Sequence, residues 1–325
     1  MSAPRLRLGF QVWAQFVSWT ELMDAGQEIE RLGFDSLWSN DHFLPLVGGP
    51  DGVVDGLQGP IFEGWMVLAG WAAGTERIRL GCLVSGAGYR NPALVVKMAT
   101  ALDHMSRGRM TLGLGAGWFE REHQAFGFAF PAVRERLDRL AEAAEIARGL
   151  LDRRAVTLAG RWHSAHGAVN APPPIQARMP LLIGGSGERR TLRIVARFAD
   201  AWSADGGDPE TFARKSAILD DHCRAVGRDP AQIRRTTGQP PALIRPTRGE
   251  AVNALARILT GHGATPPVAA SIAAASPFVG TPERVAGALR ELQSAGVEEV
   301  MFDLPMPADG RTLEALGGPI RDLIA

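Results

Sequence analysis

Residues Pro180 to Ala196 read PLLIGGSGERRTLRIVA, and this stretch is the best guide to the fold. An apolar run, Leu181–Ile183, is followed by four residues that favour a turn, namely Gly184, Gly185, Ser186 and Gly187. An amphipathic pattern rich in arginine comes next, so the order predicts a buried strand, a glycine turn and the start of a helix. Backbone amides at such a place have no internal partner and suit an anion such as phosphate. A turn whose glycines serve only tight packing is the equal alternative.

The composition indicates a soluble protein without net charge. The 325 residues include 35 Lys and Arg and 35 Asp and Glu, a balance that does not favour a nucleic-acid partner. The two cysteines, Cys82 and Cys223, match neither a metal-ligand spacing nor a disulfide framework, which favours a reduced setting. The sequence has no signal-type apolar segment and no apolar run of membrane-spanning length. We therefore expect a cytoplasmic protein without nucleic-acid, membrane or metal partners.

Strand-like and helix-like patterns alternate along the whole chain. The expected strands are Leu6–Val12, Phe34–Ser39, Ile78–Val84, Arg109–Leu114, Leu181–Ile183, Ala201–Ser203, one within Arg235–Ile244, and Glu299–Phe302. The expected helices are Thr20–Leu32 with Thr20 as its cap, Ile61–Gly74, Pro92–Met105, Val133–Leu151, Pro209–Val226, Glu250–Leu259, Pro282–Ala295 and Thr312–Ile324. The segment Val156–Gln176, which contains three consecutive prolines, is too irregular to belong to the core.

Eight strands, each followed by a helix, are typical of a (β/α)8 TIM barrel, an α/β fold. The chain shows no composition break, so we expect one domain over residues 1–325, with insertions in the loops at the carboxyl ends of the strands. A two-domain Rossmann arrangement is the competitor, but no strand is followed by G-x-G-x-x-G and no P-loop motif occurs. In a barrel the chemistry lies at the carboxyl ends of the strands, so those positions are the candidates for a site.

Two strand ends carry residues that suit catalysis or a flat ligand. Asp41 and His42 follow the second strand, and an imidazole beside a carboxylate suits proton transfer. A loop-capping Asp next to a surface His is the alternative. The fourth strand runs into Gly113, Gly115 and Gly117, which would clear one face for a flat ring unless the glycines serve tight packing.

Small residues also follow the third strand, from Gly81 to Pro92, and they predict a backbone bulge toward the mouth of the barrel. A flexible loop is the alternative. Two segments rich in Gly, Pro and Ala, Pro45–Pro60 and Gly261–Phe278, are poor in core signals and are expected to roof the pocket.

Seven stretches, in order along almost the whole chain, carry a family resemblance. They are GFDSLWSNDHF (Gly33–Phe43), EGWMVLAGWAAGTERIRLG (Glu63–Gly81), RNPALVVK (Arg90–Lys97), GRMTLGLGAGWFEREH (Gly108–His123), LLIGGSGERRTLR (Leu181–Arg193), FADAWS (Phe198–Ser203) and GTPERV (Gly280–Val285). In these stretches the chain resembles the luciferase-like monooxygenase superfamily, and more closely its branch that uses the deazaflavin coenzyme F-420.

The resemblance implies a cofactor site and catalytic residues at the mouth of the barrel. The residues that it implies for cofactor binding are Cys82, Leu83, Val84, Ser85, Gly115, Gly117, Trp118, Gly184, Gly185, Ser186 and Gly187. The last four would hold the coenzyme phosphate, and a non-proline cis peptide at Cys82–Leu83 would press the bulge against the ring. His42 and Asp41 match the family's catalytic pair beside the ring.

One departure from the family pattern bears on the substrate. The sugar-phosphate dehydrogenases of this branch carry a glutamate where this chain has Trp118, and an indole cannot protonate a lactol oxygen. Glu120 and Glu122 lie on the following helix and are expected to face away. An apolar or aromatic substrate is therefore favoured, with Trp13, Phe43 and Trp65 lining its pocket, although such residues can equally be core.

These observations support a coenzyme F-420-dependent oxidoreductase that moves a hydride between the deazaflavin and a fairly apolar organic substrate. An FMN-dependent monooxygenase of the luciferase type is the alternative, and a non-catalytic flavin-binding barrel is the second alternative. A metal-dependent hydrolase is disfavoured because His163 and His166 lack a Glu between them and lie in the irregular segment. The sequence leaves the oligomeric state, monomer or homodimer, open.

Overall fold

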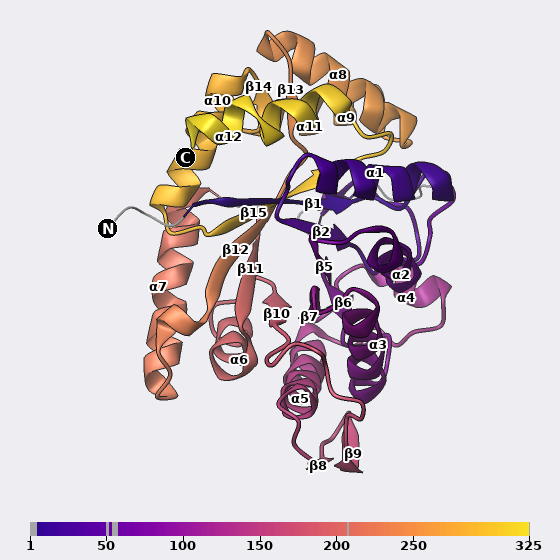
Figure 1. Ribbon diagram of the computed structural model, residues 1–325, viewed down its shortest axis with the longest axis vertical. Helices are drawn as coiled ribbons and strands as arrows, with labels where there is room; N and C mark the ends of the chain where they lie inside the picture. Colours follow the sequence, from indigo (N-terminus) through magenta and orange to yellow (C-terminus); the bar gives the residue numbers. More distant parts are fainter. Residues whose placement is uncertain (1–4, 50–51, 54–57, 207, 325) are drawn as a thin grey trace.

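The chain folds into a closed barrel of eight parallel strands, as a computed structural model describes it for residues 5–49, 52–53, 58–206 and 208–324 (Figure 1). The barrel strands are β1 (Arg7–Val12), β2 (Ser36–Ser39), β5 (Arg79–Cys82), β7 (Met110–Gly115), β10 (Leu181–Gly184), β11 (Ala201–Asp205), β12 (Arg234–Gln239) and β15 (Glu299–Leu304). Pairing of β10 with β7 and of β15 with β1 closes the ring. The (β/α)8 prediction is therefore confirmed.

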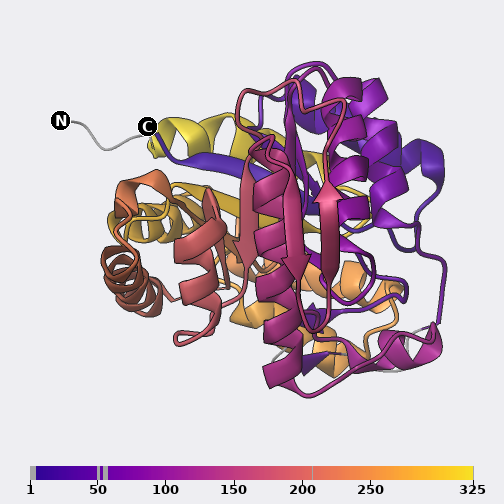
Figure 2. The ribbon, with the colours of Figure 1, turned by 90° about the horizontal axis from the view of Figure 1, so that it is seen from below.

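Helices form the outer layer around the strands (Figure 2). They are α1 (Trp19–Arg31), α2 (Gly64–Gly74), α3 (Pro92–Met105), α4 (Glu120–Ala125), α5 (Val133–Leu151), α6 (Thr191–Phe198), α7 (Pro209–Ala225), α8 (Arg248–Gly261), α9 (Pro266–Ala275), α10 (Pro282–Ser294), α11 (Gly310–Gly317) and α12 (Pro319–Leu323), with a 3-10 turn at Pro230–Gln232. Short strands outside the eight are β3 (Gly48–Gly49), β4 (Gly52–Val53), β6 (Ser85–Gly86), β8 (Val156–Ala159), β9 (Ser164–Ala168), β13 (Leu243–Ile244) and β14 (Val279–Gly280).

Residues of each strand alternate between two cores. On β15, Val300 and Phe302 belong to the large core between the strands and the helices. Met301 points the other way and packs inside the barrel with Trp38, Leu182 and Ala201. This alternation follows from the two-residue period of a strand, and it places Glu299 and Asp303 on the inner face as well.

Several predicted boundaries were wrong for local physical reasons. Helix α1 begins one residue before Thr20, because Ser18 forms the N-cap and a capping box with Glu21. The last predicted helix is in fact two helices, α11 and α12. The first helix ends before Gly318, and Pro319 begins the second, because proline cannot continue a helix from the preceding turn.

Two segments predicted as irregular loops contain regular structure. Residues 156–176 include the hairpin of β8 and β9, which lies beside α5 (Figure 1). The segment Gly261–Phe278 contains α9, whose buried Ala269 and Ala273 pack in a small core with α8. Alanine has the highest helix propensity and lets two helices approach closely, so this alanine-rich segment forms a packed helix where a loop poor in core residues was predicted. In the other predicted roof, Pro45–Pro60, residues 50–51 and 54–57 lie outside the described residues.

Within the described part of the chain, no helix combines the length and apolar character that crossing a bilayer requires.

We expect Gly113→Ala to lower the free energy of unfolding by about 1–3 kcal/mol, the usual cost of overpacking a core. A Cβ on Gly113 would lie 2.0 Å from the backbone oxygen of Cys82, which cannot rotate away. Urea denaturation measures the change. The control is Gly287→Ala in α10, where a Cβ meets open space and alanine should stabilise by about 0.5–1 kcal/mol. Equal stabilities of the two variants would contradict the prediction.

Candidate active site

The carboxyl ends of β2, β5 and β7 bring a histidine and a buried carboxylate together. His42 follows β2, and its Nδ1 lies 2.9 Å from Oε1 of Glu122 on α4. The Glu122 side chain is fully buried, whereas 18% of the His42 side chain remains exposed. The backbone amide of Phe43 donates to Oε2 of Glu122 at 2.9 Å, and the Tyr89 hydroxyl donates to Oε1. Glu122 thus fixes one nitrogen of His42, and the other nitrogen has no partner among the described residues.

The hydrogen bonds decide the charge of Glu122. Burial by itself would raise the pKa of this carboxyl, but the bonds from His42, Tyr89 and Phe43 outweigh burial and lower the pKa below its ordinary value. Burial and the neighbouring Glu122 charge raise the pKa of Tyr89, which therefore stays a neutral donor. The prediction that Glu122 faces away was wrong, because α4, which follows β7 after residues 116–119, places this residue against His42.

Asp41 is held in place by a second set of contacts. Its Oδ2 accepts from the Ser85 hydroxyl at 2.6 Å and from Nη1 of Arg90 at 2.7 Å. The other end of Arg90 donates to Glu63, the N-cap of α2, at 2.6 Å. Oδ1 of Asp41 is buried and has no hydrogen-bond partner among the described residues. Asp41 is therefore oriented with one acceptor atom left over, which excludes the reading of Asp41 and His42 as a surface pair.

The bulge after β5 is present, with its cis peptide one residue later than predicted. The cis bond joins Leu83 to Val84 and not Cys82 to Leu83. Nε2 of Gln11 donates to the Leu83 carbonyl at 2.8 Å, and the Leu83 amide donates to the Ser39 carbonyl at 2.8 Å. Leu83 and Val84 stay partly exposed, but Cys82 is fully buried and burial raises the pKa of its thiol well above the ordinary range. The Cys82 side chain is thus no cofactor contact.

The glycines of β7 and β10 make room for Val84. A Cβ on Gly115 would lie 2.5 Å from Cγ2 of Val84, and a Cβ on Gly184 would lie 3.1 Å from its Cγ1. The expectation that β7 presents a cleared face directly to a ring was therefore wrong at Gly115, because Val84 takes that space. Gly117 adopts a φ of +76°, which favours glycine, and its neighbour Trp118 packs against His42 with ring centroids 5.6 Å apart.

The glycine turn after β10 is confirmed as a turn, but one predicted free amide is occupied. Gly185 has a φ of +118°, and its amide donates to the Ser203 carbonyl at 3.0 Å. Helix α6 begins only at Thr191, so the turn is not its first turn. The amides of Ser186, Gly187 and Glu188 have no acceptor among the described residues. Only these three amides of the predicted turn therefore remain as candidate donors to an anion, because the Gly185 amide is already bonded.

The predicted pocket aromatics divide into two groups. Phe43 is partly exposed and packs with Phe128 and Tyr89, with ring centroids 5.5 and 5.0 Å away. Trp13 is 5% exposed and packs in the small core with α8 and α9, whereas Trp65 is 1% exposed in the large core. Trp65 was therefore wrong as a pocket residue, since its ring fills the space between α2 and the strands.

Asp303 is a candidate residue that the sequence analysis missed. It lies on the inner face of β15, opposite Gln11 of β1, and it is partly exposed. The Trp13 indole donates to it, yet burial dominates and raises its pKa to about 7. The predicted strand ended at Phe302, two residues before the observed end at Leu304. Its inward alternation from Glu299 through Met301 could have identified Asp303.

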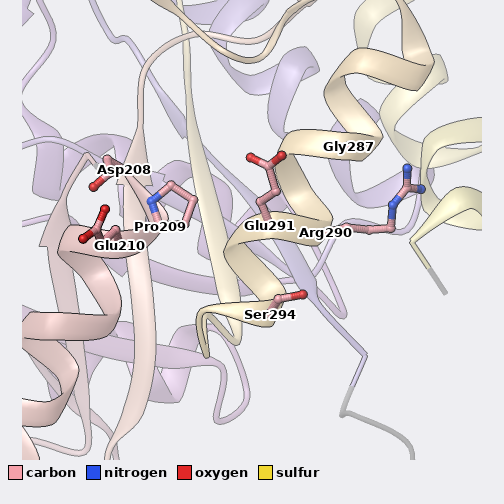
Figure 3. Close-up of a pocket in the computed structure, with 7 residues that line it drawn as sticks. All are labelled: Asp208, Pro209, Glu210, Gly287, Arg290, Glu291 and Ser294. Atoms are coloured by element: carbon pink, nitrogen blue, oxygen red, sulfur yellow. The ribbon is translucent and has the colours of Figure 1, made fainter.

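A shallow surface cavity of about 650 Å³ lies elsewhere, between the start of α7 and α10 (Figure 3). It is lined by Asp208, Pro209, Glu210, Gly287, Arg290, Glu291 and Ser294. None of these residues belongs to the barrel-end groups described above, so the cavity is no part of the candidate site. Among the residues with described positions, no three His, Cys, Asp or Glu side chains gather as they would around a metal ion.

Comparison with known proteins identifies relatives of the whole barrel. A profile of the family described as luciferase-like monooxygenase matches residues 7–299. A protein of Microbacterium testaceum named F420-dependent glucose-6-phosphate dehydrogenase is 32% identical over 226 residues. That alignment covers 69% of this chain and 64% of the relative, so the chain matches less than two thirds of the relative's length.

Solved structures share the fold at low sequence identity. The structure of an F420-dependent secondary alcohol dehydrogenase in complex with an F420-acetone adduct superposes with a TM-score of 0.83 at 18% identity, covering 99% of both chains. A coenzyme F420-dependent tetrahydromethanopterin reductase from Methanopyrus kandleri gives a TM-score of 0.80 at 18% identity, covering 99% of this chain and 100% of the other.

We expect Glu122→Gln to lower the free energy of unfolding at pH 7 by about 1–3 kcal/mol, because Gln cannot carry the charge that its three donors face. The folded-state pKa of Glu122 lies below the ordinary 4.5, so its stabilisation is complete above that pH and is lost as the pH falls further. Urea denaturation at pH 7 and pH 4 should therefore show a smaller difference at pH 4. Glu120→Gln, on the exposed face of α4, is the control, and an equal effect of both variants would contradict the prediction.

Proposed function

The chain belongs to the luciferase-like monooxygenase family, and from this premise we propose that it is an oxidoreductase that uses the deazaflavin coenzyme F-420. We propose further that it moves a hydride between this coenzyme and a small, fairly apolar organic substrate. The observation that carries the proposal is the His42–Glu122 pair, which lies at the same barrel end as Asp41 and the Leu83–Val84 bulge. The F420-dependent dehydrogenase from Microbacterium testaceum supports the choice of coenzyme.

The residues at the barrel end fit a phosphorylated ring coenzyme. The three open amides from Ser186 to Glu188 would hold a phosphate. The partly exposed Leu83 and Val84 offer a fixed apolar surface for a ring, seated on the glycines and tied to Gln11. The unpartnered Oδ1 of Asp41 would accept a hydrogen bond from the ring or the substrate. A buried acceptor of this kind is costly unless a donor reaches it.

His42 is the proposed proton-transfer residue. Its Nδ1 is engaged by Glu122, and its Nε2 has no partner among the described residues, so Nε2 is the nitrogen that would reach the substrate. A carboxylate behind the imidazole orients the ring, as in other carboxylate–histidine pairs. The bound coenzyme supplies or accepts the hydride at its ring carbon. His42 then donates the proton to the substrate oxygen in reduction and accepts it in oxidation.

The groups around His42 favour an uncharged substrate. Glu122, Asp41 and Asp303 are all carboxyl groups, and Arg90 is already paired with Asp41 and Glu63. An anionic substrate would meet these carboxylates without a free counter-charge among them. Trp118 and Phe43 add partly exposed aromatic surface. We therefore propose an apolar ketone or secondary alcohol rather than a sugar phosphate.

An FMN-dependent monooxygenase is the second candidate, because the matching family is named for that activity. The same amides could hold the FMN phosphate, and the same bulge could support its ring. The two functions differ in the coenzyme that binds and in the consumption of oxygen.

We expect the purified protein to quench the fluorescence of coenzyme F-420 in a saturable titration and to bind FMN at least ~10-fold more weakly. Ser186→Asp should weaken F-420 binding about tenfold or more, which is about 1.4 kcal/mol, by placing a negative charge beside the phosphate. A deazaflavin without the phosphate tail should bind both forms equally. Ser186→Ala is the uncharged control. Tight FMN binding with oxygen consumption and no F-420 binding would refute the proposal.

We expect His42→Ala to reduce kcat about 10²- to 10⁴-fold in F-420-dependent turnover, the usual contribution of a general acid or base. Coenzyme binding should change little, because no contact among the described residues joins His42 to the three amides proposed for the phosphate. His166→Ala on the exposed hairpin strand β9 is the matched control and should keep full activity. Undiminished turnover in His42→Ala would remove His42 from the mechanism. No turnover of the native protein with any substrate would favour the non-catalytic flavin barrel.

A further inference from the structure

The inner face of the barrel end holds a carboxyl group that the proposed mechanism does not use. Asp303 lies on β15 directly opposite Gln11, and Gln11 donates to the carbonyl of Leu83 in the bulge. Gln11 therefore links Asp303 to the Leu83–Val84 bulge, which is the proposed surface for the coenzyme ring. The Asp303 residue as a whole stays partly exposed.

The surroundings of Asp303 are almost free of charge. The uncharged Trp13 indole donates to the carboxylate, and Gln11 on β1 is neutral. On the other side, β12 pairs Gly238 with Met301, two residues before Asp303, and Gly238 has no side chain to offer. His42, from the loop after β2, is the titratable group whose charge acts on it. No arginine or lysine of the described residues forms an ion pair with Asp303, unlike Asp41.

A hydride transfer from a reduced deazaflavin to a ketone needs two proton movements. The hydride forms the new C–H bond at the substrate carbon, and the substrate oxygen gains one proton. The coenzyme ring, having given up the hydride, also loses one proton from a ring nitrogen. An acid is needed on the substrate side and a base on the ring side, and His42 can serve only one of them at a time.

We propose that Asp303 is the second proton-transfer residue of this site, accepting the ring proton while His42 protonates the substrate oxygen. The inference rests on the proposed function. In the reductive direction the O–H bond forms with the His42 proton, the ring N–H bond breaks toward the Asp303 carboxylate, and solvent later returns a proton to His42 and removes one from Asp303. The reverse direction uses the same groups in the opposite states.

The protonation behaviour of Asp303 supports this assignment. Burial raises its pKa to about 7, whereas the indole bond and the His42 charge lower it only in part. A base with a pKa near the working pH is the most effective one, because it is largely available and still accepts a proton readily. An ordinary surface aspartate, whose pKa is about 4, would be a poor acceptor of the ring proton at neutral pH.

The first test reads Asp303 directly and needs no coenzyme. With ¹⁵N-labelled tryptophan, the Trp13 indole signal, assigned with Trp13→Phe, should shift with pH and show a midpoint between 6 and 8. The shift should vanish in Asp303→Asn and persist in the exposed control Asp24→Asn. Thermal unfolding gives a second readout, since a raised native pKa makes the carboxylate costly above pH 4 and most costly above pH 7. Asp303→Asn should therefore raise Tm much more at pH 8 than at pH 4.5.

The second test follows F-420-dependent turnover with the reduced coenzyme and an apolar ketone. We expect Asp303→Asn to lower kcat about 10- to 100-fold, to keep coenzyme binding within a few-fold, and to lose the ionisation near pH 7 from the rate profile. Asp303→Glu should recover part of the rate. His42→Ala should be slow and yet keep that ionisation.

The outcomes separate this inference from the proposed function. A native protein that turns over with coenzyme F-420, together with an Asp303→Asn variant of unchanged rate and pH profile, overturns the role of Asp303 alone. An indole signal that does not titrate between pH 5.5 and 8.5 also overturns it. A native protein that neither binds nor oxidises the coenzyme overturns the proposed function and this inference together.

Discussion

The burial of the Glu122 carboxylate is the constraint on which the site depends. A buried charge is stable only when donors surround it, and here the donors are His42, the Tyr89 hydroxyl and the Phe43 amide. These three groups come from the loops after β2 and β6, so satisfying one carboxylate fixes two separate loops relative to α4. The position of His42 is therefore a consequence of electrostatics rather than of loop packing alone.

A second constraint is steric and supports the first. The bulge after β5 brings Val84 over the inner ends of β7 and β10, where Gly115 and Gly184 leave space for it. Gln11, on β1, also fixes the bulge because its side chain donates a hydrogen bond to the Leu83 carbonyl. Strands from both halves of the barrel thereby fix the same short segment. The surface that this segment presents is set by the barrel core and not by a free loop.

The sequence predicted the barrel well because strand and helix periodicities are local signals that repeat along the chain. It placed helices Pro92–Met105 and Val133–Leu151 with the observed bounds. It failed where contacts between distant residues decide the outcome. The direction of Glu122 depends on Tyr89 and His42, and the burial of Trp65 depends on the packing of α2, neither of which local spacing reveals. The occupied amide of Gly185 depends on Ser203 of the next strand in the same way.

The joining of β15 to β1 has a consequence for the order in which the molecule is made. The register pairs Arg7 with Glu299 and Gln11 with Asp303, so the first strand waits for one nearly three hundred residues away. Such long-range pairing is slow, and during synthesis β1 leaves the ribosome long before its neighbour exists. Until β15 has been synthesised, the edge of β1 that will pair with it has no partner strand. We expect folding of this protein to depend on chaperones at this late stage. Among the barrel strands β15 is translated last, and it both closes the barrel and carries the inner carboxyl group of Asp303.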